Sequence, residues 1–390
     1  MSYQRFGASF ETVLASFPAW APKVDGSFTL VSTGDLAPLH ALKGQQRETH
    51  EVWEYLRSVE LAMVNLELPL TTVDQPADKA ITLRADPGIA PSLREAGVDV
   101  VTVANNHALD HGPEGLFETV DVLKSSGIAA VGGGADLEQA LQPALLSVNG
   151  LLVAVFGLAS TLPPGYAATS QRPGIAPIRV LSKFLIDSTT LDEQPGMSPW
   201  VETEAVEEDV RRACGEIAAV RDEADLVVVQ IHWGVPNGWC AAFQGPLADY
   251  QRPLGHALIE AGADLVVGHH PHTVHGVERY RQGLIAYSLG NFLFHSMSQD
   301  NELALADSSP PYNLESLQTG EALETVLLEV RVEGGRMERA RFRPVRMNSD
   351  GEPQFLDVVE AGTVLSRITA QSSRLGVSIE LGDGEAALRL

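Results

Sequence analysis

Short apolar runs alternate with helical patterns along most of the chain, and this alternation predicts a layered α/β protein. Apolar runs rich in valine and leucine predict strands at 28–33, 61–64, 98–104, 151–157, 226–231, 264–268 and 283–287. Helical spacing of apolar residues predicts helices at 48–59, 89–96, 113–126 and 246–261. The fold class expected from the pattern is therefore α/β.

The remaining segments give the expected domain organisation. Residues 1–26 form an N-terminal arm, 27–350 the main domain, and 351–390 a C-terminal tail with one helix. Residues 160–200 are rich in proline and glycine, which is typical of a lid or a substrate loop when it interrupts a compact chain. The acidic stretch 201–222 predicts a helix, and residues 324–332 and 337–345 alternate like a β-hairpin.

Charge and cysteine content narrow the classes of partner. The chain has 390 residues and a formal net charge of −24, so we expect no nucleic-acid partner, because phosphate binding requires an excess of Lys and Arg. Its two cysteines, Cys214 and Cys240, provide no disulfide framework. Neither a signal peptide nor a transmembrane helix is recognisable, which predicts a cytoplasmic protein without a membrane partner. The oligomeric state stays open.

Polar residues follow the predicted strands at the point where each strand ends. In an open α/β sheet, ligands bind beyond the carboxyl ends of the strands, so these side chains are expected to meet at one edge. Mixed nitrogen and oxygen ligation of this kind predicts one or two divalent metal ions, Mn, Zn, Co, Fe or Mg. The residues at these positions are Asp35, Glu67, Asn106, His107, His232, His270 and His272.

The strongest of these signals is Gly268-His-His-Pro-His272, where His270 and His272 can point the same way if the backbone stays extended. His269 is expected to be structural, because adjacent side chains diverge. Other interpretations remain open. The histidines could bond to backbone, Asp35 could cap a helix, Asn106 could be a turn residue, and His107 could only bond a carboxylate. Trp233 and Trp239 could belong to the core or line an apolar pocket.

The motifs together resemble the CapA, or poly-γ-glutamate-synthesis, branch of the calcineurin-like metallophosphatases. The resemblance covers roughly residues 27–295. The matching segments are Ser32-Thr-Gly-Asp35, Asn65-Leu-Glu67, Ala104-Asn-Asn-His107-Ala-Leu-Asp110, His232-Trp-Gly234, Gly268-His-His-Pro-His272 and Tyr287-Ser-Leu-Gly-Asn-Phe292.

The resemblance implies a four-layer αββα sandwich around a dinuclear metal centre. Glu67 would bridge the two metals; Asn106, His232 and His270 would complete one site, and Asp35 and His272 the other. His107 matches the catalytic imidazole, with Asp110 as its orienting carboxylate. The chain departs from the phosphatases of this superfamily at one position, where Ala37 replaces their histidine. This departure disfavours ordinary phosphoester hydrolysis.

Three functions follow from these observations. The first is a metal-dependent acid/base enzyme that inverts a Cα centre in a peptide substrate, since soluble members of this branch resemble a lasso-peptide epimerase acting on a C-terminal tryptophan. The second is a metal-dependent hydrolase of a phosphoester or a γ-glutamyl amide. The third is a non-catalytic role with a polyglutamate capsule, which the acidic surface disfavours by repulsion.

Overall fold

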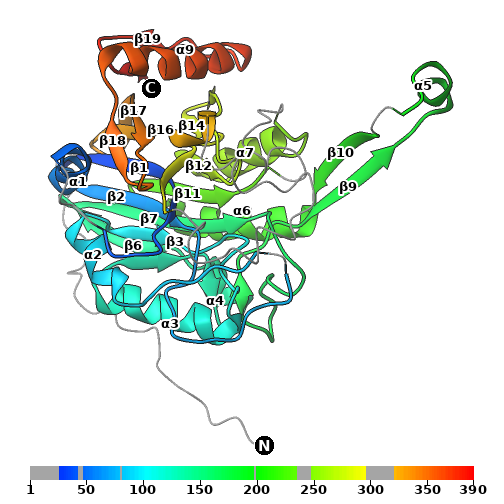
Figure 1. The fold of residues 1–390 in the computed structure, drawn as a ribbon, viewed down its shortest axis with the longest axis horizontal. Coiled ribbons are helices and arrows are strands. Elements are labelled where there is room, and N and C mark those ends of the chain that lie inside the picture. The colour runs from blue at the N-terminus through cyan, green and yellow to red at the C-terminus, as the bar shows by residue number, and fades with distance from the viewer. Residues whose placement is uncertain (1–25, 43–46, 80, 197–198, 235–246, 296–319) are drawn as a thin grey trace, which may run out of the picture.

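The computed structural model describes residues 26–42, 47–79, 81–196, 199–234, 247–295 and 320–390, and Figure 1 shows their arrangement. The N-terminal arm predicted for 1–26 lies almost entirely outside these residues. Within them, two large sheets carry most of the strands. The strand order is β19-β20-β17-β16-β1-β2-β3-β4 in the first sheet, where β15 also pairs with β1 and β18 with β17. The order is β13-β14-β12-β11-β7-β6 in the second.

The strands of the first sheet are β1 (Ser27–Ala37), β2 (Leu61–Leu66), β3 (Val100–Thr102), β4 (Ala129–Val131), β15 (Asn291–Phe294), β16 (Glu324–Glu333), β17 (Arg336–Met347), β18 (Pro353–Phe355), β19 (Glu380–Leu381) and β20 (Ala386–Arg389). Those of the second are β6 (Ala144–Val148), β7 (Leu151–Ala159), β11 (Leu226–His232), β12 (Leu265–His269), β13 (Val277–Tyr280) and β14 (Gly283–Ala286). The helices are α1 (Arg47–Ser58), α2 (Ile89–Glu95), α3 (Gly112–Ser125), α4 (Leu137–Leu141), α5 (Ser188–Glu193), α6 (Glu207–Arg221), α7 (Gln251–Glu260) and α9 (Val358–Arg374), and a short 3-10 turn, η2, spans Gly320–Leu323.

The two sheets pack face to face, and helices cover their outer faces (Figure 1). Successive side chains of a strand point to opposite faces of a sheet, so each central strand serves two cores. In β2, Leu61 and Met63 join the core between the sheets, whereas Ala62 and Val64 pack with the core under α1, α2 and α3. The second sheet likewise packs outward against α6 and α7. The expected four-layer αββα sandwich is therefore what the structure shows.

The C-terminal segment is more than the predicted tail. Helix α9 contributes Val364, Leu365 and Ile368 to the core between the sheets, and β20 pairs with β17. In Figure 1, α9 lies across one end of the sandwich. Residues 351–390 therefore complete the main sheet and close its core, because their apolar side chains are buried there.

The sequence interpretation of residues 160–222 was wrong in two places. The predicted loop at 160–200 contains β8 (Gly174–Ile175), which pairs with β5 (Gly133–Gly134), then β9 (Val180–Leu185) and α5. The predicted helix at 201–222 begins only at Glu207, because Trp200–Ala205 forms β10 and pairs with β9. Charged residues alternate with Val201, Thr203 and Ala205 in β10, and this period of two is that of a strand.

Candidate metal centre

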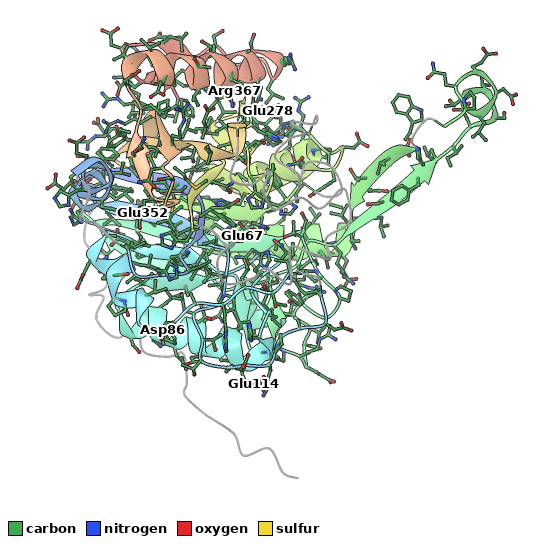
Figure 2. All side chains as sticks on the ribbon, in the orientation of Figure 1. Glu67, Asp86, Glu114, Glu278, Glu352 and Arg367 are labelled. Carbon is green, nitrogen blue, oxygen red and sulfur yellow. The ribbon has the colours of Figure 1, made fainter. Side chains whose placement is uncertain are left out.

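The polar residues at the strand ends meet where the two sheets adjoin. Asp35 lies in β1, and Glu67 directly follows β2, which runs parallel to β1. His232 ends β11, and His270 directly follows the parallel neighbour β12. Figure 2 labels Glu67, which lies near the middle of the molecule. Carboxyl ends of strands from both sheets thus face one small volume.

The first group of potential ligands is Glu67, His232 and His270, whose donor atoms all lie within 4.8 Å of one another. The Nε2 atom of His232 lies 3.3 Å from Oε1 of Glu67 and 2.8 Å from Oδ1 of Asn106. The rings of His232 and His270 are in edge contact, with centroids 4.9 Å apart. Two imidazoles, a carboxylate and an amide oxygen therefore converge, which is a donor set that borderline divalent metals accept.

The second group is Asp35, Glu67 and His272, again with donor atoms within 4.8 Å. His272 places Nδ1 at 2.7 Å from Oδ1 of Asn291 and 3.5 Å from Oδ2 of Asp35, and places Nε2 at 3.7 Å from Oε1 of Glu67. Because Asn291 Oδ1 can only accept, Nδ1 of His272 donates to it and Nε2 keeps its lone pair. Glu67 belongs to both groups, so it lies where a carboxylate bridging two ions would be.

The two buried carboxylates of this site have opposite pKa shifts. Burial alone would raise the pKa of Asp35, but the imidazole of His269, whose Nδ1 lies 3.0 Å from Oδ1, and the other histidines nearby hold it below its usual value. Asp35 also accepts hydrogen bonds from Asn65 Nδ2 at 2.9 Å and from the backbone N–H of His270 at 3.1 Å. Burial raises the pKa of Glu67 to about 8, and the charge of Asp35 adds to this shift. Burial therefore favours the protonated form of Glu67, whereas its surroundings favour the ionised form of Asp35.

The two histidines after β12 have left-handed backbone conformations. The φ angle is 96° at His270 and 54° at His272, so the expected extended backbone is wrong. Non-glycine residues held in this region cost about 1–3 kcal/mol each and persist where the surrounding structure fixes them. Here the backbone N–H of His270 bonds Asp35, and His272 bonds Asn291. The turn directs both rings toward Glu67 at the expense of backbone strain.

The donor atoms of the site lack partners that a cation would provide. Among the described residues, neither oxygen of Glu67 and neither ring nitrogen of His270 accepts or donates a hydrogen bond, although all four atoms are buried. Burial also lowers the pKa of His232 and His270 well below the usual value, so both rings are neutral and offer lone pairs. Buried polar atoms without partners are costly, and a divalent ion would satisfy them. The residues present therefore fit a metal.

Beside this cluster, His107 is held by a buried carboxylate. Asp110 Oδ2 lies 2.6 Å from Nδ1 of His107, and Oδ1 accepts from Lys79 Nζ at 2.6 Å and from Tyr166 OH at 2.9 Å. Although burial would raise the pKa of Asp110, the charges and hydrogen bonds of His107 and Lys79 keep it below its usual value. An ionised Asp110 fixes the proton of His107 on Nδ1 and leaves Nε2 as a base.

Sequence reasoning missed five residues that position this site. Lys79 and Tyr166 bond Asp110, and Asn291 bonds His272. Asn65 bonds Asp35 and also accepts from Asn105 Nδ2 at 3.0 Å, while Asn105 Oδ1 accepts from the backbone N–H of His107. Asn65 and Asn105 each lie within two residues of a predicted ligand, which is a usable signal. Lys79 and Tyr166 lie on loops, where the spacing of residues gave no such signal.

Three other positions concern alternatives that the sequence left open. Ala37 is 2% exposed and packs in the core under α1, so no ligand comes from this position. His269 places Nδ1 3.0 Å from Asp35 Oδ1, but neither of its buried ring nitrogens has a hydrogen-bond partner among the described residues, so its structural role stays a prediction. Trp233 is fully buried, stacks on Tyr287 and donates from Nε1 to the Tyr287 carbonyl, so it is a core residue. Trp239 lies outside the described residues.

The αββα sandwich, with two ligand groups sharing Glu67 at the strand ends, defines an α/β fold of metallophosphatase type. Residues 29–296 match the family described as bacterial capsule synthesis protein PGA_cap. The chain therefore belongs to this family, the CapA branch of the metallophosphatase superfamily.

Several known proteins are similar to this chain. The capsule biosynthesis protein CapA of Bacillus anthracis is 32% identical over 246 residues, which are 62% of this chain and 52% of that protein. The uncharacterized protein y4uA of Sinorhizobium fredii is 26% identical and 94% of each chain is covered. A hypothetical protein from Thermus thermophilus superposes with a TM-score of 0.43 at 18% identity, over 79% of this chain and 95% of that one.

The chain spans about half the length of the Bacillus anthracis relative. In the part of the chain that the structure describes, no helix has both the length and the apolar composition needed to cross a bilayer.

Proposed function

We propose that the chain is a metal-dependent acid/base enzyme that inverts a Cα centre in a peptide, the C-terminal tryptophan of a ribosomally made lasso precursor being the favoured substrate. The observation that supports it most is His107, an imidazole held by a buried carboxylate directly after the candidate ligand Asn106. Such a geometry is that of a general base, because the orienting carboxylate fixes the tautomer and stabilises the imidazolium.

The chain's own residues divide the work. One or two divalent ions would be held by Glu67, which the two ligand groups share. Asn106, His232 and His270 complete one group, and Asp35 and His272 complete the other. When bound, a divalent ion polarises a carbonyl or carboxylate and makes the adjacent Cα–H more acidic. Nε2 of His107 takes that proton, and Asp110 stabilises the resulting imidazolium. Lys79 and Tyr166 keep Asp110 in place.

Inversion conserves protons. The Cα–H bond breaks toward one acid/base group, and a new Cα–H bond forms from a second acid on the opposite face, so the product differs only in configuration. The reaction needs no redox partner and no cleaved bond. His107 serves as the base on one face, and it serves as the acid when the reaction runs in reverse.

The residue at position 37 favours proton transfer over phosphoester hydrolysis. In the phosphatases that the chain resembles, a histidine occupies this position, whereas here Ala37 is buried among apolar side chains. The group of Asp35, Glu67 and His272 consequently has one imidazole fewer than a phosphatase site. A weaker second site suits a role in binding a carboxylate better than in activating a hydroxide at two metals.

The deciding experiment is Cα exchange. The full chain loaded with Mn²⁺ is incubated in deuterated water with lasso-type precursor peptides that end in tryptophan, and deuterium at Cα is read by mass spectrometry, with chiral analysis of the hydrolysed residue. Uptake that chelator and His107→Ala abolish is the expected result. Absence of Cα deuterium in every peptide tested contradicts the proposal.

A second candidate is a metal-dependent hydrolase of a phosphoester or a γ-glutamyl amide. It is favoured by the shared position of Glu67 in two ligand groups, since a pair of ions can clamp a displacement reaction. Phosphate or amine release from a panel of such substrates, lost with chelator, would support it.

A capsule-associated role is favoured by the names of the relatives, but the net charge of −24 would repel polyglutamate. A binding assay with the polymer tests it.

A further inference from the structure

A long hairpin, which we call the arm, projects from the body of the molecule (Figure 1). It consists of β9, α5 and β10, and within the described residues β9 and β10 pair only with each other. A two-stranded hairpin that packs on nothing is at best marginally stable in water. Val180 and Ala205 pack against the core at the base of the arm, whereas its outer part, residues 181–186, is exposed and gains no such support.

The arm also carries most of the large apolar side chains that the described part of the chain exposes. These are Leu181, Phe184, Leu185, Ile186, Leu191 and Trp200, and Trp200 is 60% exposed. Apolar residues gathered on one projecting element, rather than scattered over the surface, mark an interaction site.

One face of the arm is hollowed. The hollow has a volume of about 950 Å³ and is lined by residues that include Leu185, Trp200, Lys183, Glu202, Glu204 and Asp249. The strand register explains part of this composition, because Trp200 pairs with Leu185 and Glu202 with Lys183, and directly paired residues share a face. Val201 and Thr203 of the other face also line the hollow. The hollow therefore has an apolar end and an acidic end.

Charge on this face is unbalanced. Four carboxylates line the hollow, from Asp187, Glu202, Glu204 and Asp249, against the single ammonium of Lys183. Lys183 lies 3.8 Å from Glu204, and Asp187 caps α5. Among the described residues, Glu202 and Asp249 form no ion pair with a cationic side chain. A ligand that places a cation here would be attracted.

We infer that this face of the arm docks an extended peptide segment that carries a basic side chain two residues from an apolar one. Successive same-face rows of a strand are about 7 Å apart, as are alternate side chains of an extended peptide, so the two patterns match. A second copy of the chain is disfavoured, because each copy would bring another acidic arm and another charge of −24. This inference rests on the proposed function in one respect: the docked segment is taken to be part of the peptide substrate.

The arm is continuous with the candidate site. The segment that carries Tyr166 against Asp110 runs through β8, and the chain enters the arm at Val180. At the base of the arm, the backbone N–H of Thr203 donates to Asp249 Oδ2 at 3.2 Å. The segment from Tyr166 to Val180 therefore links the arm to the residues that position His107. A substrate bound at the arm by one end would gain binding energy there, although that end does not touch the reacting atoms.

The test measures binding directly. A fluorescent 12-residue peptide with leucine and lysine two residues apart is titrated with the full chain by anisotropy, beside the peptide in which glutamate replaces lysine. We expect the lysine peptide alone to bind, and to bind more weakly as salt rises. The double variant Glu202→Lys with Glu204→Lys should weaken the affinity for the lysine peptide about tenfold, and Trp200→Ala should weaken it by several fold.

The matched control is Glu216→Lys with Glu338→Lys, which changes the net charge equally at exposed positions away from the hollow, on α6 and β17. It should leave the affinity within about twofold. Equal losses in both double variants overturn the inference, as does unchanged affinity in the arm variants. Self-association of the wild-type chain in sedimentation that Trp200→Ala abolishes also overturns it, because a second copy would then cover the hollow.

This readout requires no turnover and so separates the two proposals. Peptide binding at the arm without any Cα exchange supports the docking surface and contradicts the proposed reaction. Cα exchange whose KM is unchanged by the arm variants supports the reaction and contradicts the docking surface.

Discussion

His107 and Asp110 share a hydrogen bond of 2.6 Å between Nδ1 and Oδ2, three residues apart on one turn that follows β3. The carboxylate is fully buried and accepts from Lys79, Tyr166 and the backbone N–H of Leu83 as well. Satisfied in this way, Asp110 cannot rotate toward another partner, so it fixes both the tautomer and the orientation of the imidazole.

Replacing His107 by alanine should lower the rate of Cα exchange by about 10²–10⁴-fold, the usual contribution of a general acid or base. Asp110→Asn should lower it by about tenfold or more, because the amide can present a donor to Nδ1 and favour the wrong tautomer. Both variants should retain the metal-induced rise in Tm, measured by differential scanning fluorimetry with Mn²⁺. Loss of that rise in His107→Ala would place His107 among the ligands instead.

Lys79→Met should act mainly on the base, through Asp110. Nζ of Lys79 binds Asp110 and the Asn106 carbonyl, so its loss removes one hydrogen bond that holds the carboxylate. We expect kcat to fall about tenfold with little change in KM, since the residue acts through Asp110. Lys79→Arg should restore part of the rate, and equal loss in both variants would contradict a positioning role.

Glu67→Gln should remove every metal ion that the site binds, because this carboxylate is common to the two ligand groups. Wild-type protein at one hundred times its Kd for metal gains about 2.7 kcal/mol of stability, and the variant should gain far less. Asp35→Asn should lose only one metal in elemental analysis. The control is Glu352→Gln, which alters a buried carboxylate bonded to His295, at a separate position in Figure 2, and should keep the full metal effect.

Metal affinity should fall as the pH is lowered. The pKa of Glu67 in the metal-free chain is raised to about 8, so below that pH its carboxyl group carries a proton that the metal must displace. Affinity should therefore weaken by up to about tenfold per pH unit from 8 toward 6, with one proton released per chain. Titration calorimetry in buffers of different ionisation enthalpy measures that release, and a pH-independent affinity would contradict the assignment of Glu67.

The strain at His270 should appear in the metal-free stability. Glycine adopts a φ of 96° without cost, so His270→Gly relieves about 1–3 kcal/mol of strain while losing a buried ring. His232→Gly loses a similar ring from strand β11, where glycine only weakens the strand. In urea unfolding with chelator, His270→Gly should be the less destabilised of the two by roughly that amount. The reverse order would mean that the turn is unstrained.

The positions of the central strands along the chain could be predicted from local periodicity, and the meeting of their ends could be predicted because parallel strands of an α/β sheet end at one edge. Asp35, Glu67 and His232 each follow or end a run of buried valine and leucine residues, and parallel pairing then brings those ends together. The alternation of Leu61 and Met63 with Ala62 and Val64 assigns each side chain to one core. These features need no knowledge of distant contacts.

What could not be predicted depends on contacts between segments far apart in sequence. Tyr166 meets Asp110 from a proline-rich segment 56 residues away, and the positive φ of His270 reflects its bond to Asp35, 235 residues away. The arm was missed because its main pairing joins β9 to β10 across α5. Single-segment periodicity contains no information on such pairings.

The two sheets supply different donor atoms to the cluster of candidate ligands. The oxygen donors Asp35, Glu67 and Asn106 come from the first sheet, and the nitrogen donors His232, His270 and His272 come from the second. During synthesis, a chain that ends before residue 226 would thus present oxygen donors alone, which suit magnesium or calcium better than zinc. A borderline metal would then be selected only after the later half of the polypeptide has folded against the earlier one, so metal binding would report completed assembly.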